Sequence, residues 1–253
     1  MGSRIAPCIL LGILLARPAS AAPGILLLAD RGTAEWNTSI NQLAAAVDKR
    51  TPAEAVLWSA SPNVQAAVER LVKRGVSEIV AVPLFIAAAP SDLASHVKSS
   101  VPLRVAAPLN GDPVLGDIVL ARAERISKNS GGEVLVIVSH RAASAADKRW
   151  IPDLRAAAVE LNRTRRFAAV LTTTLPADSS EASTNDAAKL RSVLERQIAA
   201  GRRILVVPML TPYGGPENAI KQQLHGLAHE LAKSTLVPDD RLVAWIVSRA
   251  EEK

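Results

Sequence analysis

The chain carries the same unit of sequence twice, and this repeat constrains its fold more than any other feature. The apolar run 24–29 leads into a short polar turn, and the apolar run 133–138 does the same. A second echo joins residues 77–86 to residues 202–210, with Pro83 and Pro208 in matching places. Because the repeat spans more than about a hundred residues, it is too long for a solenoid and predicts a duplicated domain.

The clearest echo lies at the ends of the two units. Residues 109–124 align without a gap on residues 236–251, so Asp112 matches Asp239. Each segment reads as the closing helix of its unit. Duplication would place two equivalent sets of loops around one cleft, and function is expected in that cleft.

The first 21 residues resemble a secretory signal peptide. Arg4 supplies positive charge, residues 5–16 form a short apolar stretch, and residues 19–21 form a small-residue cleavage site. We expect a mature chain that begins near Ala22, is exported to the periplasm or secreted, and has no transmembrane span after cleavage. An uncleaved membrane anchor is the alternative.

Composition restricts the chemistry of the mature chain. The only cysteine, Cys8, lies in the expected signal, so disulfides and thiolate sites are excluded. Hydrophobic residues make up 49% of the chain and aromatic residues 3%, which suits aliphatic helices packed on parallel strands. The net charge of +6 favours anionic partners. We expect no nucleic acid among them, because no aromatic residues are interleaved with the arginines for base stacking.

Strand-like apolar runs alternate with helical patterns, which is typical of βαβ units. We predict an α/β protein of two tandem three-layer domains, 22–129 and 130–253, each with a parallel sheet. The turn-rich segment 129–132 divides them. The expected strands are 25–28, 55–58, 78–84, 103–106, 134–138, 168–172, 204–207 and 234–237. The expected helices are 37–49, 61–74, 112–128, 148–162, 186–200, 216–233 and one from residue 239. Ser61 is the expected N-terminal cap of the helix 61–74.

Polar side chains follow the expected strands at the edge where open parallel sheets bind ligands. Arg31 follows the first strand, and His140 and Arg141 follow its repeat. Glu217 lies past the strand that ends at Pro208, at the start of a helix. Each has an ordinary alternative, since a histidine can simply bond a neighbouring loop and a glutamate can stabilise its own helix dipole.

The other three histidines are weaker candidates. His96 follows the third strand of the first unit and could equally be a surface residue. His225 and His229 are four apart on the expected helix 216–233, a spacing at which two imidazoles can share a metal. No carboxylate motif accompanies this pair, so an ordinary helix surface is favoured there.

The ordered set of these segments resembles the class II tetrapyrrole chelatases, which insert cobalt or iron into sirohydrochlorin-type macrocycles. The resemblance rests on the strand ending at His140, on the Val-Pro-Leu-Phe segment 82–85 followed by His96, and on residues 107–115. It covers nearly all of the mature chain as two tandem units. It implies that His96 and His140 bind the incoming divalent metal, cobalt or iron with nickel possible, and help to remove pyrrole protons.

The second unit is also similar to the protoporphyrin ferrochelatases, which pair a histidine with a glutamate that follows a strand ending in proline. By that similarity His140 and Glu217 form the working pair. In the first unit Arg31 stands where the family has histidine. Arginine stays cationic and cannot ligate a metal. The site of the first unit is therefore expected either to have lost its activity or to serve another role. Arg31 and Arg141 would then attract the carboxylates of the macrocycle.

These residue types suit metal insertion. A metal held by few ligands can be passed on to the macrocycle, and a neutral imidazole, with an ordinary pKa of about 6.5, can accept a pyrrole proton. We therefore expect a metal-inserting lyase acting on an anionic tetrapyrrole. The alternative is an exported protein, derived from a chelatase, that binds metal or tetrapyrrole without catalysis. A structural duplicate with no ligand is a third reading.

Overall fold

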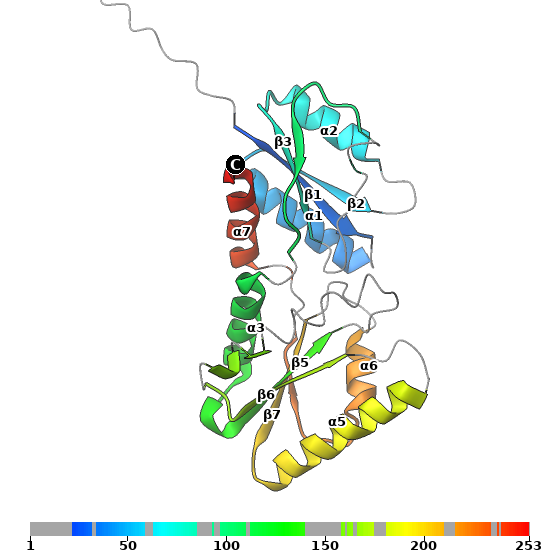
Figure 1. Ribbon diagram of the computed structural model, residues 1–253, viewed down its shortest axis with the longest axis vertical. Helices are drawn as coiled ribbons and strands as arrows, with labels where there is room; N and C mark the ends of the chain where they lie inside the picture. Colours follow the sequence, from blue (N-terminus) through cyan, green and yellow to red (C-terminus); the bar gives the residue numbers. More distant parts are fainter. Residues whose placement is uncertain are drawn as a thin grey trace, which may run out of the picture.

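The computed structural model shows two sheets, each flanked by helices (Figure 1). The residues that it describes are 22–31, 34–58, 63–84, 93, 97–109, 112–139, 158–159, 161–163, 166–174, 181–209, 216–233, 237 and 239–252. The expected signal peptide lies outside these residues and stays a prediction, as does most of the expected helix 148–162. Within the described part of the chain, no helix has the length and apolar character needed to cross a bilayer.

Within the described residues each sheet has four strands, and all of the strand pairs are parallel. The first sheet has the order β2-β1-β3-β4, and the second has the order β6-β5-β7-β8. The strands are β1 (Gly24–Asp30), β2 (Ala53–Trp58), β3 (Ile79–Pro83), β4 (Leu103–Val105), β5 (Glu133–Ser139), β6 (Ala169–Thr174), β7 (Arg203–Pro208) and β8 (Glu230–Leu231). The predicted α/β class with two parallel sheets is confirmed.

Helices cover both faces of each sheet. They are α1 (Ala34–Asp48), α2 (Val64–Lys73), α3 (Pro113–Ile126), α5 (Glu181–Ala199), α6 (Pro216–Gln223) and α7 (Asp240–Glu251), with the short 3-10 helix η2 (Ser130–Gly132) between the units. In β1, Ile25 and Leu27 face the core under α1, whereas Leu26 and Leu28 face the core under α2. A strand buried on both faces is typical of a parallel sheet, and this explains its continuous apolar run.

Several helix boundaries differ from the predictions; α1 begins three residues earlier than expected and α5 five residues earlier. The helix α2 begins at Val64, because the side chain of Asn63 accepts a hydrogen bond from the N–H of Ala66 at 3.2 Å; the predicted cap Ser61 lies outside the described residues. The expected helix 216–233 is wrong, since α6 ends at Gln223 and Gly226 adopts a φ of 80°. The strand that pairs with β7 is β8, which lies inside that expected helix.

The closing helix of each sequence unit packs on the sheet of the other unit. The helix α7, near the end of the chain, lies against β1, β3 and α1 of the first half, and α3 lies against β7 of the second (Figure 1). We call α3 and α7 the exchanged helices. They also contact each other, and their apolar side chains join the inner faces of both sheets in one continuous core.

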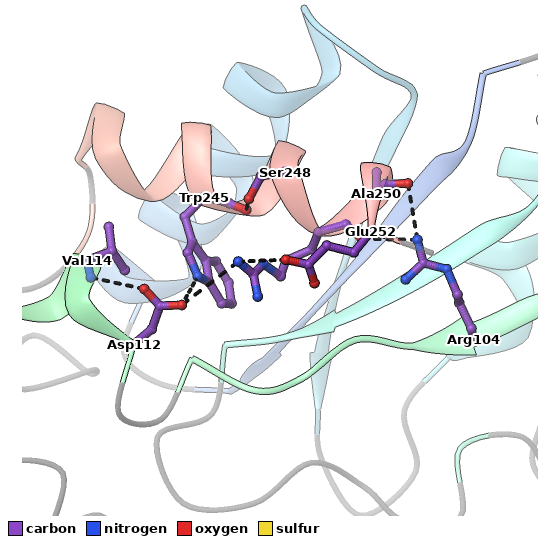
Figure 2. Close-up of polar contacts among 8 residues, drawn as sticks. Arg104, Asp112, Val114, Trp245, Ser248, Ala250 and Glu252 are labelled. Atoms are coloured by element: carbon purple, nitrogen blue, oxygen red, sulfur yellow. Dashed lines mark hydrogen bonds and ion pairs between the residues drawn. The ribbon is translucent and has the colours of Figure 1, made fainter.

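Asp112 links the exchanged helices at the start of α3. Its Oδ1 accepts a hydrogen bond from the N–H of Val114 at 3.0 Å and so caps α3. Its Oδ2 accepts one from the indole N–H of Trp245 in α7 at 2.6 Å and lies 4.0 Å from the guanidinium of Arg249 (Figure 2). That guanidinium lies over the indole, 5.0 Å from the ring centre.

The reverse arrangement links the start of α7 to α3. Asp239 caps α7 by accepting a hydrogen bond from the N–H of Arg241 at 3.0 Å. Arg122 of α3 is 3% exposed, and burial lowers its pKa to about 10 while the negative charge of Asp239 opposes that fall. Arg122 and Arg249 are matched by the sequence repeat, as are the two capping aspartates. The helix pair therefore has an internal two-fold relation.

The last turn of α7 is held by the first sheet. Arg104 of β4 donates from Nη2 to the carbonyl oxygens of Arg249 and Ala250, both at 3.1 Å (Figure 2). A cation at this end of a helix also complements the helix dipole. The helix α7 is thus fixed to the first half at its C-terminal end and joined to the start of α3 through Trp245 and Arg249.

A buried carboxylate fixes the segment between the units. Glu133, at the start of β5, is 1% exposed and forms an ion pair with Arg203 of β7. It also accepts hydrogen bonds from the hydroxyl of Ser127 and, at 2.9 Å, from the N–H of Lys128. Burial favours a raised pKa for Glu133, but these hydrogen bonds, a further one from the N–H of Asn129 and the charge of Arg203 together lower its pKa.

The substitution Trp245→Phe should lower the free energy of unfolding by about 1–2 kcal/mol, because the ring packing is kept while Asp112 loses a partly buried donor. Urea denaturation measures the difference. The control is Ser248→Ala, since that hydroxyl donates to the carbonyl of Trp245 inside the same helix at 2.7 Å and its loss should cost less than about 0.5 kcal/mol. Equal effects of the two substitutions would contradict a stabilising role for the contact between the helices.

The substitution Glu133→Gln should lower the free energy of unfolding by about 2 kcal/mol at pH 7, because the amide cannot replace a charged acceptor. A lowered pKa means that the carboxylate stabilises the fold above its ordinary pKa of 4.5 and loses this effect as the pH falls through the folded pKa. Urea denaturation of both proteins at pH 7 and at successively lower pH should show the gap narrowing. A gap that does not change with pH would refute this assignment.

Candidate functional site

The two sheets end alike at their carboxyl edges. In the first sheet Leu28 of β1 lies opposite Pro83 of β3, and in the second Val138 of β5 lies opposite Pro208 of β7. In both sheets the residue after the proline donates its N–H to the carbonyl of the paired residue at 2.7 Å. Figure 1 shows β1 and β5 running toward the region between the two sheets. The loops that follow these strands therefore start from equivalent positions.

This register shifts the match between the units by one residue from the match suggested by the sequence. Leu28 corresponds to Val138, and both lie in the outer cores, against α2 and against α5 and α6 respectively. The sequence repeat instead matched Leu28 to Ile137, which faces the core shared with α3. Because side chains alternate along a strand, a slip of one residue would place matched residues on opposite faces. The match from strand pairing is the correct one.

The match from strand pairing can be continued along the sequence beyond the strands. Since Ala29 corresponds to Ser139, continued numbering sets Asp30 against His140, which lies outside the described residues. The interpretation that Arg31 stands in the place of His140 differs from this numbering by one residue and stays a prediction. By the same numbering Arg31 falls opposite Arg141, so each unit carries an arginine within two residues of the end of its central strand in sequence.

The expected metal-binding residues fall mainly outside the described part of the chain. This holds for His96, His140 and Arg141, and for the side chain of Glu217, whose backbone lies in the first turn of α6. Their convergence stays a prediction. Among the residues that are described, no group of three or more histidine, cysteine, aspartate or glutamate side chains is placed to hold a metal ion.

The weaker pair, His225 and His229, does not share a helix. Both residues follow the end of α6 at Gln223, and Nδ1 of His229 lies 2.8 Å from the carbonyl oxygen of Leu227. The spacing of four residues therefore does not place the two imidazoles on one helical face. The helical argument for a metal site at this pair is wrong.

Arg31 is exposed and lies at a cavity along the free edge of β2. The cavity has a volume of about 240 Å³ and lies between that edge and residues of α1 and α2. Its lining residues are Arg31, Asn41, Ala55, Val56, Leu57, Asn63, Ala66 and Arg70. Sequence reasoning identified only Arg31 among them, because the asparagines carry no motif; the helix-capping position of Asn63 was the available signal.

A second cavity, of about 310 Å³, lies at the opposite end of the second sheet. It is lined by residues that precede β5 and β6, including Ser130 and Phe167. The guanidinium of Arg166 in its wall is paired with Glu124 at 2.5 Å. Ligands of parallel sheets bind at the carboxyl ends of the strands, so this cavity is not the favoured site.

Comparison with known proteins confirms the resemblance to the class II chelatases. Residues 25–126 match the CbiX family model. No curated protein sequence matches the chain significantly. The family model matches the first unit up to the end of α3. The second unit is compared with known proteins through its fold alone, in the solved structures.

Three solved structures share the fold over both units. SirB from Bacillus subtilis with Fe3+ has a TM-score of 0.73 at 19% identity, covering 91% of this chain and 95% of that one. SirB from Bacillus subtilis subspecies spizizenii with cobalt has a TM-score of 0.66 at 17% identity, covering 91% of this chain and 94% of that one. CbiX, the terminal enzyme for siroheme biosynthesis in denitrifying bacteria, has a TM-score of 0.61 at 18% identity, covering 91% of this chain and 98% of that one. The whole arrangement of two sheets and exchanged helices is thus a chelatase fold.

Proposed function

We propose that this protein, whose residues 25–126 match the CbiX family model and whose fold is that of the class II chelatases, inserts a divalent metal into an anionic tetrapyrrole. The observation that carries the proposal is the likeness to chelatases over the full length of both units, joined to the family match of the first. A sirohydrochlorin-type macrocycle and cobalt or iron are the favoured substrates, because SirB structures contain Fe3+ and cobalt.

In this proposal His140 and Glu217 do the chemistry. The imidazole and the carboxylate hold the metal with few bonds, so that it can pass to the macrocycle nitrogens. A neutral imidazole then accepts a proton from a pyrrole as the metal enters. His96 assists from the first unit. Arg31 and Arg141, in the segments that follow β1 and β5, draw the carboxylates of the macrocycle into the site.

A binding protein without catalysis is the second candidate. It is favoured by the first unit, where neither Asp30, which ends β1, nor Arg31, which follows it, is a histidine. The expected signal peptide also favours it, because an exported chelatase would act away from cytoplasmic tetrapyrrole synthesis. N-terminal sequencing of protein recovered outside the cytoplasm should find a chain that begins near Ala22.

Insertion should be seen directly when the protein is mixed with sirohydrochlorin and cobalt or iron(II) and the absorbance is followed against a protein-free control. The substitution His140→Ala should lower kcat/KM at least about a hundredfold, because it removes both a metal ligand and the proton acceptor. The matched control is His225→Ala, a loss of an exposed histidine that should leave the rate unchanged. Binding without insertion by the wild type would favour the second candidate, and full activity of His140→Ala would exclude this site.

The register of the strands predicts at which residue a new histidine would add a ligand to the metal site. Because Asp30 corresponds to His140, the substitution Asp30→His should raise the affinity for cobalt(II), measured by calorimetry without tetrapyrrole. The substitution Arg31→His should leave that affinity unchanged, since residue 31 lies one position further along. If Arg31→His raises the affinity for cobalt(II) and Asp30→His does not, the loops, and not the strands, determine which residue of the first unit corresponds to His140.

A further inference from the structure

We propose that the cavity at the free edge of β2 binds one carboxylate arm of the tetrapyrrole and so sets the orientation of the macrocycle. This inference rests on the proposed function and extends it by naming a substrate-positioning pocket. The cavity is reached from Arg31, which directly follows β1 at the carboxyl edge of the first sheet. Its volume of about 240 Å³ admits a short acidic side arm but not a macrocycle.

The edge strand supplies backbone donors to this cavity. The N–H of Ile25 donates to the carbonyl of Pro52 at 2.7 Å, whereas the N–H of Ala53 turns away from the sheet to Oδ1 of Asp48, also at 2.7 Å. Because the pattern repeats every two residues, the N–H groups of Ala55 and Leu57 point outward as well. No described group accepts a hydrogen bond from either of them, and both residues line the cavity.

The side chains add further donors and positive charge. Arg31 forms no ion pair with any described acidic side chain. Asn63 uses its oxygen to accept from the N–H of Ala66, so its amide nitrogen remains available as a donor. Arg70 is already neutralised by Glu54 at 3.0 Å. The lining therefore has one guanidinium whose charge is not balanced within the described part of the chain.

A cavity rich in N–H donors selects an anion over a metal ion. A guanidinium with amide N–H donors near it suits the charge and the hydrogen-bonding needs of a carboxylate. The proposed macrocycle carries several carboxylate arms, and only some of them can lie near the metal. A carboxylate arm held at β2 would fix the orientation of the macrocycle relative to the loop after β1. The pocket would therefore orient the substrate and would take no part in proton transfer.

The experiment measures binding of metal-free sirohydrochlorin to the full-length chain through the absorbance of the macrocycle. The substitution Arg31→Gln should raise the Kd about tenfold, and so should Asn63→Asp, which puts a negative charge into the pocket. Aspartate caps helices as well as asparagine does, so the thermal stability of Asn63→Asp should match the wild type. A fully esterified sirohydrochlorin should bind both variants and the wild type equally, because it has no carboxylate to lose.

Two controls separate the pocket from general charge. Arg50→Gln removes an exposed arginine outside the cavity, and Gln42→Glu adds a negative charge on α1 beside the lining residue Asn41. Each should change the Kd less than about twofold. If the wild type binds the macrocycle but the pocket variants behave like these controls, the pocket is excluded and the proposed function stands. If the wild type binds no macrocycle at all, both proposals fall.

Discussion

The reciprocal pairing of Asp112 and Asp239 with arginines of the opposite helix is the interaction on which the rest of the molecule depends. Each aspartate caps its own helix and also faces a cationic side chain of the other exchanged helix. A helix cap on the surface is worth about 1 kcal/mol, but these caps also join two sheets that share no strand. The same carboxylates therefore determine where two helices begin and how the two halves of the protein are held.

This arrangement gives the carboxyl edges of the two sheets a rigid support. The helix α7 packs on β1 and β3, the strands that lead to Arg31 and to the loop of His96, while α3 packs on β7, which leads to Glu217. Residues that act on one substrate from different halves need a scaffold that fixes their starting points. The loops can then vary in sequence, as the two units do after β1 and β5, without loss of the frame.

Much of this fold could be predicted from the sequence, because apolar periodicity, capping aspartates and the repeat are local signals. The exchange of α3 and α7 could not, since an apolar helical stripe does not say which sheet will cover it. The one-residue error in the match between β1 and β5 has a similar cause. Both strands are buried on both faces, so their sequences do not alternate and cannot fix the register. The asparagines at the β2 edge were missed because their role depends on an edge strand that only the folded sheet defines.

The exchanged helices also decide when this chain can finish folding. The first sheet is complete in sequence by Val105, yet part of its inner face is covered by α7, whose residues begin at Asp240. A newly made N-terminal half therefore keeps apolar surface open until almost the whole chain has been synthesised, and its contacts are of the long-range kind that form slowly.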